Sequence, residues 1–402
     1  MTNSLFADAR NWRVAITAAV FAWTSLVGIF VGSAYAAPIF ILAGVLFVCG
    51  AIRGQWPAID RPLLSLAILL VAMCWASTVW SIAPQRTLHG ALQITGVFAA
   101  SLILLGEAKT LSAGSGVIFA AAMAGASIGA ALGAIDFLTG FPIMGHVLTP
   151  DSPVYAKGAK MDRGLSYLVF ILWPILAFAW RSRWRLWSIG FAAVCCAVVA
   201  VCYGITVQLS LGAGIAAFAV ALIAPRLVAV ALSILVAIVA IATPILALDF
   251  GARLLPLAGQ IRSSAVHRLE IWDYMSRRAL ERPLSGWGWW SSLELPIHPD
   301  ELAKYRYVTP MGTSHPHGNW MQLWVETGVV GAAIGLAFAL LVIWRAWRLP
   351  KAYQPFALAS CASVFIVSLA SFDLATDSWW AALSATALLF TIAPKSVSPR
   401  VA

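Results

Sequence analysis

Residues 227–248 read LVAVALSILVAIVAIATPILAL, a run of 22 residues without a charged side chain. A helix of about 20 apolar residues spans the hydrocarbon core of a bilayer, so this run predicts a membrane-spanning helix. The whole chain has the same character, since 61% of its 402 residues are hydrophobic and 10% are charged. Soluble domains have about 25% charged residues. The composition therefore excludes a soluble enzyme and a disordered chain, and it predicts an all-α polytopic membrane protein.

Twelve apolar runs are candidate spanning helices. They cover residues 14–32, 35–52, 62–82, 87–106, 114–138, 164–180, 186–204, 207–224, 227–248, 323–344, 354–372 and 378–394. In the fifth run, Gly125, Gly129 and Gly133 recur at four-residue spacing, which favours close packing against another helix.

The basic residues predict how these helices are oriented. If the N-terminus is inside, 14 of the 26 Lys and Arg residues fall on inner segments, whereas the short outer loops near residues 33, 204 and 375 carry none. Short cytoplasmic loops are enriched in Lys and Arg. We therefore expect a multi-pass membrane protein with both termini in the cytoplasm.

This topology divides the chain into three parts. Residues 1–248 hold nine spans and an outer loop at 139–163, residues 249–322 form a large periplasmic loop, and residues 323–402 hold three spans and a cytoplasmic tail. All six Cys lie within apolar runs, so neither a disulfide framework nor a zinc site is expected.

The other basic residues gather on the outer side. Eleven of the remaining twelve lie in the two outer loops, with five of the six His in or beside them. This concentration predicts an anionic ligand and proton transfer at the outer face. The alternative is ordinary loop surface whose basic side chains reach toward lipid phosphates. The distribution of Lys and Arg across this topology accounts for the net charge of +10. We therefore expect membrane lipids, and no nucleic acid, as partners.

The long loop contains a predicted amphipathic helix from Ser263 to Glu281, which ends at Arg282-Pro283. Arg268 and Trp272 are four residues apart and share one face. We expect this helix to lie along the outer membrane surface, with Arg268 at the level of a lipid-linked phosphate.

A second motif, Ser314-His315-Pro316-His317-Gly318-Asn319, introduces the tenth span, on which Gln322 and Glu326 follow. Polar groups at the mouth of a span are functional candidates. A neutral imidazole suits proton abstraction from a hydroxyl, so His317 is a candidate general base, with His315, Asn319, Gln322 and Trp272 in support. The alternatives are helix capping or a metal site, for which no third ligand stands at fixed spacing.

These residues resemble the O-antigen ligase and O-antigen polymerase superfamily of bacterial envelope glycosyltransferases. His317-Gly318, nine residues and Gly328-Val329-Val330-Gly331 resemble the family signature His-[Asn/Ser/Gln]-x9-Gly-x-x-Gly. The segment from Arg268-x-x-x-Trp272 to Pro283-Leu284-Ser285-Gly286-Trp287-Gly288 is similar to the block that precedes it. The architecture implied is like that of class C glycosyltransferases, with about 12 transmembrane helices and short amphipathic helices in the periplasmic loop.

Two positions depart from the family pattern. Gly318 stands where relatives have an amide, and Ser210-Leu211-Gly212 stands where many relatives have Ser-Arg-Gly. Arg163 is our candidate substitute for the missing arginine, with Arg262 and Lys160 as helpers.

The resemblance implies transfer of a glycan from undecaprenyl diphosphate to lipid A–core on the periplasmic face, inverting and without metal or other cofactor. Arg268, Arg163, Arg262 and Lys160 would bind the diphosphate, and His317 and Arg268 would act in catalysis. An O-antigen polymerase and a protein O-oligosaccharyltransferase are alternatives with the same chemistry. A transporter or flippase is less favoured, because the halves show no repeat and the ionisable residues gather at the outer boundary.

Overall fold

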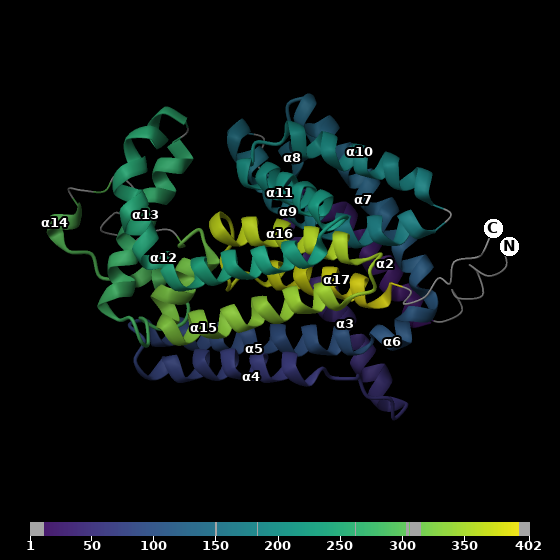
Figure 1. Ribbon diagram of the computed structural model, residues 1–402, viewed down its shortest axis with the longest axis horizontal. Helices are drawn as coiled ribbons and strands as arrows, with labels where there is room; N and C mark the ends of the chain where they lie inside the picture. The colour runs from purple at the N-terminus through teal and green to yellow at the C-terminus, as the bar shows by residue number, and fades with distance from the viewer. Residues whose placement is uncertain are drawn as a thin grey trace.

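The computed structural model describes residues 12–148, 151–182, 184–261, 263–302, 305 and 315–393, and every regular element in this part of the chain is a helix (Figure 1). In chain order the main helices are α2 (Trp12–Val27), α3 (Ala36–Ile52), α4 (Arg61–Ala76), α5 (Pro84–Gly106), α6 (Ala108–Leu111), α7 (Ser115–Leu138), α8 (Pro142–Val147), α9 (Val154–Arg181), α10 (Arg185–Val201), α11 (Ile205–Ala221), α12 (Pro225–Ile261), α13 (Ser263–Glu281), α14 (Pro299–Leu302), α15 (Asn319–Arg348), α16 (Gln354–Ala370) and α17 (Asp377–Ile392). Short 3-10 turns are η1 (Gly32–Tyr35), η2 (Ser77–Val79), η3 (Ser112–Gly114) and η4 (Ser292–Glu294).

Within the described residues, seven helical segments are long and apolar enough to cross a membrane: Gly32–Ile52, Arg61–Val79, Pro84–Gly106, Ala108–Leu138, Val154–Arg181, Pro225–Leu248 and Asn319–Arg348. Four shorter apolar helices, α2, α10, α11 and α16, coincide with further predicted runs. The all-helical membrane class is therefore confirmed, and the count of twelve spans stays a prediction.

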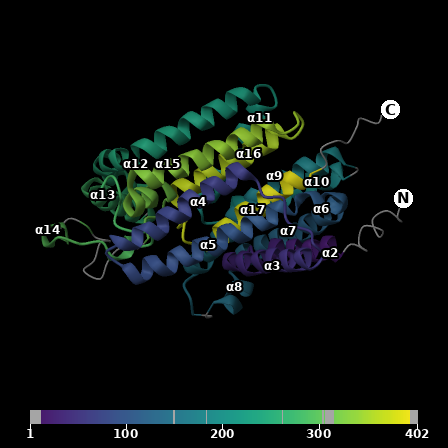
Figure 2. The same ribbon diagram turned by 90° about the horizontal axis from the view of Figure 1, so that it is seen from below.

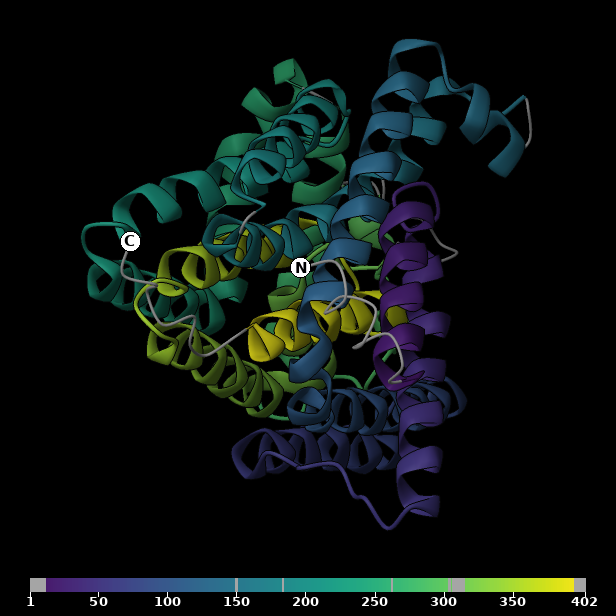
Figure 3. The same ribbon diagram turned by 90° about the vertical axis from the view of Figure 1, so that its right-hand side faces the viewer.

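Helices α4, α5, α12, α15 and α16 run along the long axis of the molecule, whereas α13 stands across it at one end (Figure 1). The glycine spacing predicted to give close packing does so between α2 and α7. A Cβ atom at Gly125 would collide with the carbonyl oxygen of Ala22, and one at Gly129 would lie 2.8 Å from that of Leu26. Viewed from the right-hand end, α2 and α7 stand next to each other (Figure 3).

Two helices are longer than the predicted spans. α9 begins at Val154, ten residues before the predicted start at 164, so Lys157, Lys160 and Arg163 lie on its first turns and not in a loop. α12 continues beyond residue 248 to Ile261. Both extensions carry polar residues, so hydropathy marks only the apolar part of each helix.

The predicted amphipathic helix is confirmed, because α13 runs from Ser263 to Glu281 and turn-rich chain follows. It stands beside the far end of α12 at one end of the molecule (Figure 1). Its buried face includes Ile271, Tyr274, Met275 and Ala279, which form a small core with Val325 of α15 and residues of the following loop. The segment 263–302 is thus a packed unit joined to the bundle.

Candidate active site

The His motif lies directly before α15, whose N-cap is Gly318. A Cβ atom at Gly318 would lie 2.6 Å from the carbonyl oxygen of Leu369 on α16, so a larger residue would push the two helices apart. This contact explains why glycine occupies the position where relatives carry an amide. Asn319 is buried, and its Oδ1 atom lacks a hydrogen-bond partner in the described part of the chain.

His317 has an unusual backbone, with a φ angle of +52°. This region costs a non-glycine residue about 1–3 kcal/mol and is often occupied at functional sites. The His317 amide donates to Nδ1 of His315 over 3.2 Å, and the two ring centroids are 4.0 Å apart. The ring of His267 on α13 meets His317 edge-on at 5.2 Å between centroids. The three imidazole rings therefore lie together. The sequence motif had indicated only His315 and His317.

The predicted partners Arg268 and Trp272 hold α13 to this motif. Trp272 Nε1 donates to the carbonyl oxygen of Pro316 over 2.9 Å. Arg268 Nε donates over 3.0 Å to the carbonyl oxygen of Ala370, the last residue of α16. The C-terminus of a helix attracts a cation, which stabilises this placement. Burial lowers the pKa of Arg268, and the charge of Asp162 opposes this shift.

Arg163 reaches the same region from α9. Its stem lies against Gly32, where an added Cβ atom would be 2.8 Å from Arg163 Cγ, and its guanidinium carbon is 5.7 Å from the ring centroid of Phe372. Lys160 lies one turn earlier on α9 and is exposed, without a hydrogen bond or ion pair to the cluster in the described residues. Arg262 lies outside the described residues.

The surroundings keep all three imidazoles neutral. Burial lowers the pKa of His317 to about 2, with further lowering from His315, Arg268 and His267. Burial also lowers the pKa of His315, where Asp373 opposes the shift and Arg163, Arg268 and His267 add to it. The pKa of His267 is lowered by burial and by Arg268, with an opposing effect of Glu270. A site of this kind disfavours added positive charge and favours an anion.

Asp373, in the turn between α16 and α17, was not among the predicted site residues. Its Oδ1 accepts from Gln322 Nε2 over 2.6 Å and from the amide of Ala375 over 2.7 Å. Gln322 Nε2 also approaches both carboxylate oxygens of Glu326, at 3.2 and 3.3 Å, as their four-residue spacing indicated. The signal available in the sequence was a pair of acids, Asp373 and Asp377, between two apolar runs, and this pattern does not indicate their partners.

The two sequence blocks of the family signature are joined by backbone hydrogen bonds. α15 is broken at Gly328, which has a φ angle of +65° and a ψ angle of −160°. The carbonyl groups of Val325 and Glu326 accept from the amides of Trp287 and Gly288 over 2.9 Å each, and the amide of Val329 donates to Pro283 over 2.8 Å. Gly288 and Gly328, both with positive φ angles, therefore have a structural role, which is to let the 283–288 loop replace part of the helical hydrogen bonding of α15.

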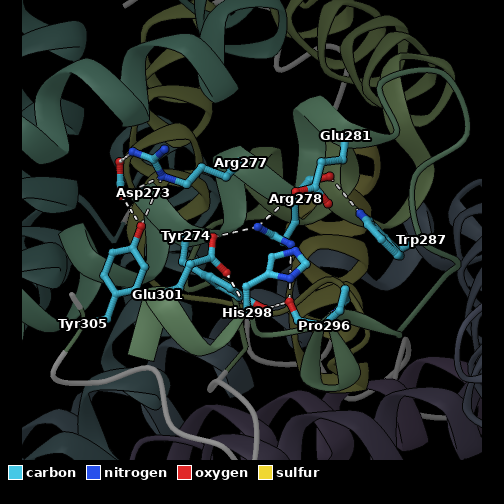
Figure 4. A network of polar contacts seen from close by, with 10 residues as sticks. All are labelled: Asp273, Tyr274, Arg277, Arg278, Glu281, Trp287, Pro296, His298, Glu301 and Tyr305. Atoms are coloured by element: carbon cyan, nitrogen blue, oxygen red, sulfur yellow. Dashed lines mark hydrogen bonds and ion pairs between the residues drawn. The ribbon is translucent and has the colours of Figure 1, made fainter. Parts of the chain in front are cut away.

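Two other arginines of α13, Arg277 and Arg278, bind residues of α13 and of the segment that follows it (Figure 4). Arg278 is almost fully buried and pairs with Glu301 at 2.7 Å and Glu281 at 3.0 Å. Arg277 pairs with Asp273 at 3.2 Å, and the hydroxyl of Tyr305 also bonds to Asp273. These cations are neutralised within the protein. Arg163 and Arg268, in contrast, act on the imidazole of His315 and are the candidates for binding an anionic ligand.

The position of the missing family arginine is occupied by a helix contact. Leu211 is buried, and next to it Ser210 exchanges two hydrogen bonds of 2.9 Å with Ser363 of α16. In the part of the chain that the structure describes, no three His, Cys, Asp or Glu side chains are grouped so as to hold a metal ion.

Fold and site together define a polytopic helical membrane protein with a histidine and arginine site at one end of its helices. Residues 204–336 match the model of a family described as O-antigen ligase, so the predicted resemblance to that family is confirmed for this third of the chain. Proteins of Rickettsia typhi and Rickettsia conorii, each named "Putative polysaccharide ligase", are 27% identical over 124 residues and 26% identical over 122 residues. These alignments cover 30% and 29% of this chain, and the same shares of the two relatives.

Proposed function

We propose that this chain transfers a glycan from undecaprenyl diphosphate to lipid A–core on the periplasmic face of the bacterial inner membrane. The observation that carries the proposal is the meeting of Arg268, Arg163 and three neutral imidazoles at the start of α15. Similarity to an O-antigen ligase family model over 204–336 supports the same chemistry. A ligase of this kind would attach the glycan to lipid A–core and so produce lipopolysaccharide.

In this proposal the two arginines bind the diphosphate of the donor. A guanidinium offers several N–H groups in one plane and can bind two phosphate oxygens at once. When the bond between the anomeric carbon and the diphosphate oxygen breaks, its electron pair remains on that oxygen. Fixed cations that face this developing charge lower the barrier without a metal ion.

His317 takes the proton of the acceptor hydroxyl as the oxygen attacks the anomeric carbon from the opposite side, so one displacement inverts the configuration. Burial lowers the pKa of His317 to about 2, which is too low for an effective base near neutral pH. A bound diphosphate places negative charge beside Arg163, Arg268 and the imidazoles, and this raises the pKa of His317. Donor binding would thereby activate the base.

The acceptor distinguishes the three related activities. Purified protein would be given an undecaprenyl-diphosphate glycan with lipid A–core, with a second undecaprenyl-linked repeat, or with a periplasmic protein, each with and without excess EDTA. We expect glycan on lipid A–core in both conditions. Product only on the second repeat or on protein would establish the polymerase or the protein O-oligosaccharyltransferase, and metal-dependent product would contradict the metal-free mechanism.

Two variants serve as controls in the same assay. His317→Ala should abolish most product, whereas Lys160→Ala should behave as wild type because Lys160 is exposed outside the cluster. A transporter or flippase would be indicated if the donor crossed the bilayer of proteoliposomes without a covalent product. That result would contradict the proposed transfer.

A further inference from the structure

We propose that His315 is a positioning residue, whose Nδ1 atom accepts the backbone amide of His317 and holds the base in its left-handed conformation. This inference rests on the proposed function of His317. It adds that protonation of His315 at Nδ1 removes this hydrogen bond and so displaces the base. His315 need not touch either substrate for this role.

The geometry fixes the protonation state of His315. An N–H donor 3.2 Å from Nδ1 requires a lone pair on that atom, so the neutral ring must carry its proton on Nε2. The hydrogen bond spans two residues and closes a turn around Pro316, whose carbonyl oxygen accepts from Trp272. The turn is what places His317 at a φ angle of +52°, a conformation that an L-residue rarely adopts without such support.

The charged groups around His315 come from three other elements. Arg163 on α9 and His267 and Arg268 on α13 disfavour a second proton, while Asp373 in the α16–α17 turn favours it; His317 stands at 4.0 Å between ring centroids. Burial and the cations prevail, so the pKa of His315 lies below its ordinary value. The hydrogen bond is therefore present at neutral pH and is lost as the pH falls through the pKa of His315.

Three substitutions separate this role from the others. Asparagine can accept the amide two residues on through its Oδ1 atom, as in an Asx turn, and it does not titrate. Glutamine is one methylene longer and retains an N–H group near the position of Nε2, while alanine retains neither feature. The variants are His315→Asn, His315→Gln and His315→Ala.

The experiment measures glycan transfer by each variant between pH 5 and 8.5, with donor affinity measured separately. We expect His315→Ala and His315→Gln to lose about 10²-fold in turnover through misplacement of the base, with donor affinity unchanged. His315→Asn should recover at least about tenfold relative to alanine, and its acid limb of kcat/KM should move to lower pH. The exposed control His146→Asn should leave that limb in place.

Recovery by glutamine in place of asparagine, or loss of donor affinity in all three variants, would overturn the proposal and make His315 a phosphate ligand. An acid limb that is unchanged in His315→Asn would also overturn it. If wild-type protein transfers no glycan, the proposed function fails. In that case ¹⁵N NMR of labelled histidines still tests the hydrogen bond from the His317 amide to His315 Nδ1. A protonated Nδ1 of His315 at neutral pH would contradict this hydrogen bond.

Discussion

Arg268 differs from its neighbours Arg277 and Arg278 in what its guanidinium binds. Those two form ion pairs with carboxylates of the same unit, whereas Arg268 Nε donates to the carbonyl oxygen of Ala370 and the charge of Asp162 on α9 acts on its guanidinium. The carbonyl group at the helix end orients the guanidinium. The planar guanidinium can keep this hydrogen bond while other N–H groups meet a ligand, which a lysine ammonium at the same place could not reproduce.

We therefore expect Arg268→Lys to bind the donor at least about tenfold more weakly, nearly as weakly as Arg268→Ala, since hydrogen bonds to charged groups contribute about 1.5–3 kcal/mol. The measurement is the dissociation constant of a lipid-linked diphosphate glycan, with Arg277→Lys as the matched control. Wild-type affinity in Arg268→Lys would show that Arg268 only joins α13 to α16.

His317→Ala should leave the affinity for the donor largely intact and lower turnover by about 10²–10⁴-fold, the usual contribution of a general base. Single-turnover transfer at saturating donor between pH 5.5 and 8.5 checks this. If affinity falls while the rate constant is unchanged, His317 is a phosphate ligand and another group is the base.

At the scale of elements, the break in α15 joins the His motif to α13. Helical hydrogen bonding is interrupted at Gly328, and Trp287, Gly288 and Pro283 supply the partners that the broken turn lacks. The same loop is tied back to α13 by the Trp287 indole, which donates to the carbonyl oxygen of Arg278 over 2.8 Å. This backbone junction thus acts together with the Trp272–Pro316 hydrogen bond in holding α13 next to the His motif.

Gly328→Ala should destabilise this junction by about 1–3 kcal/mol, because alanine is strained at a φ of +65° and its Cβ atom would lie 2.8 Å from the Pro283 carbonyl oxygen. The check is thermal unfolding in detergent together with protease sensitivity of the 283–302 segment. Gly96→Ala is the matched control, since a Cβ atom there meets nothing within 4 Å and the residue is helical. Equal stability of the two variants would contradict this account of α15.

At the scale of the molecule, the start of α2 and the end of α17 lie at one end of the bundle, and α13 lies at the other (Figures 1 and 2). This arrangement agrees with termini on one side and the candidate site on the opposite side. Which end faces the periplasm follows from the Lys and Arg distribution alone and remains a prediction.

Cysteine labelling tests the orientation. In spheroplasts, a membrane-impermeant maleimide should label Leu284→Cys, whose position is 72% exposed beside α13. It should label Lys351→Cys, in the exposed turn after α15, only after permeabilisation. The reverse pattern would place the His and Arg site in the cytoplasm, where a periplasmic transfer could not occur.

The sequence by itself determined the elements. Apolar length located the apolar part of the helices, the apolar spacing of 263–281 gave α13 with its bounds, and the glycine repeat of α7 indicated close packing against another helix, which the structure shows to be α2. The His and Arg motifs also identified His315, His317, Arg268 and Trp272 as candidate site residues. These features are local, because a span or an amphipathic face depends on residues within a few turns of one another.

Only the tertiary structure decided which side chains meet. Asp373 and His267 join the cluster, Arg163 reaches it from a helix that begins ten residues earlier than hydropathy indicated, and Arg278 is committed to Glu301. Basic side chains look alike in a sequence, since their charge does not reveal whether a carboxylate from another element neutralises it. That depends on how α9, α13, α15 and α16 pack together, which no local pattern encodes.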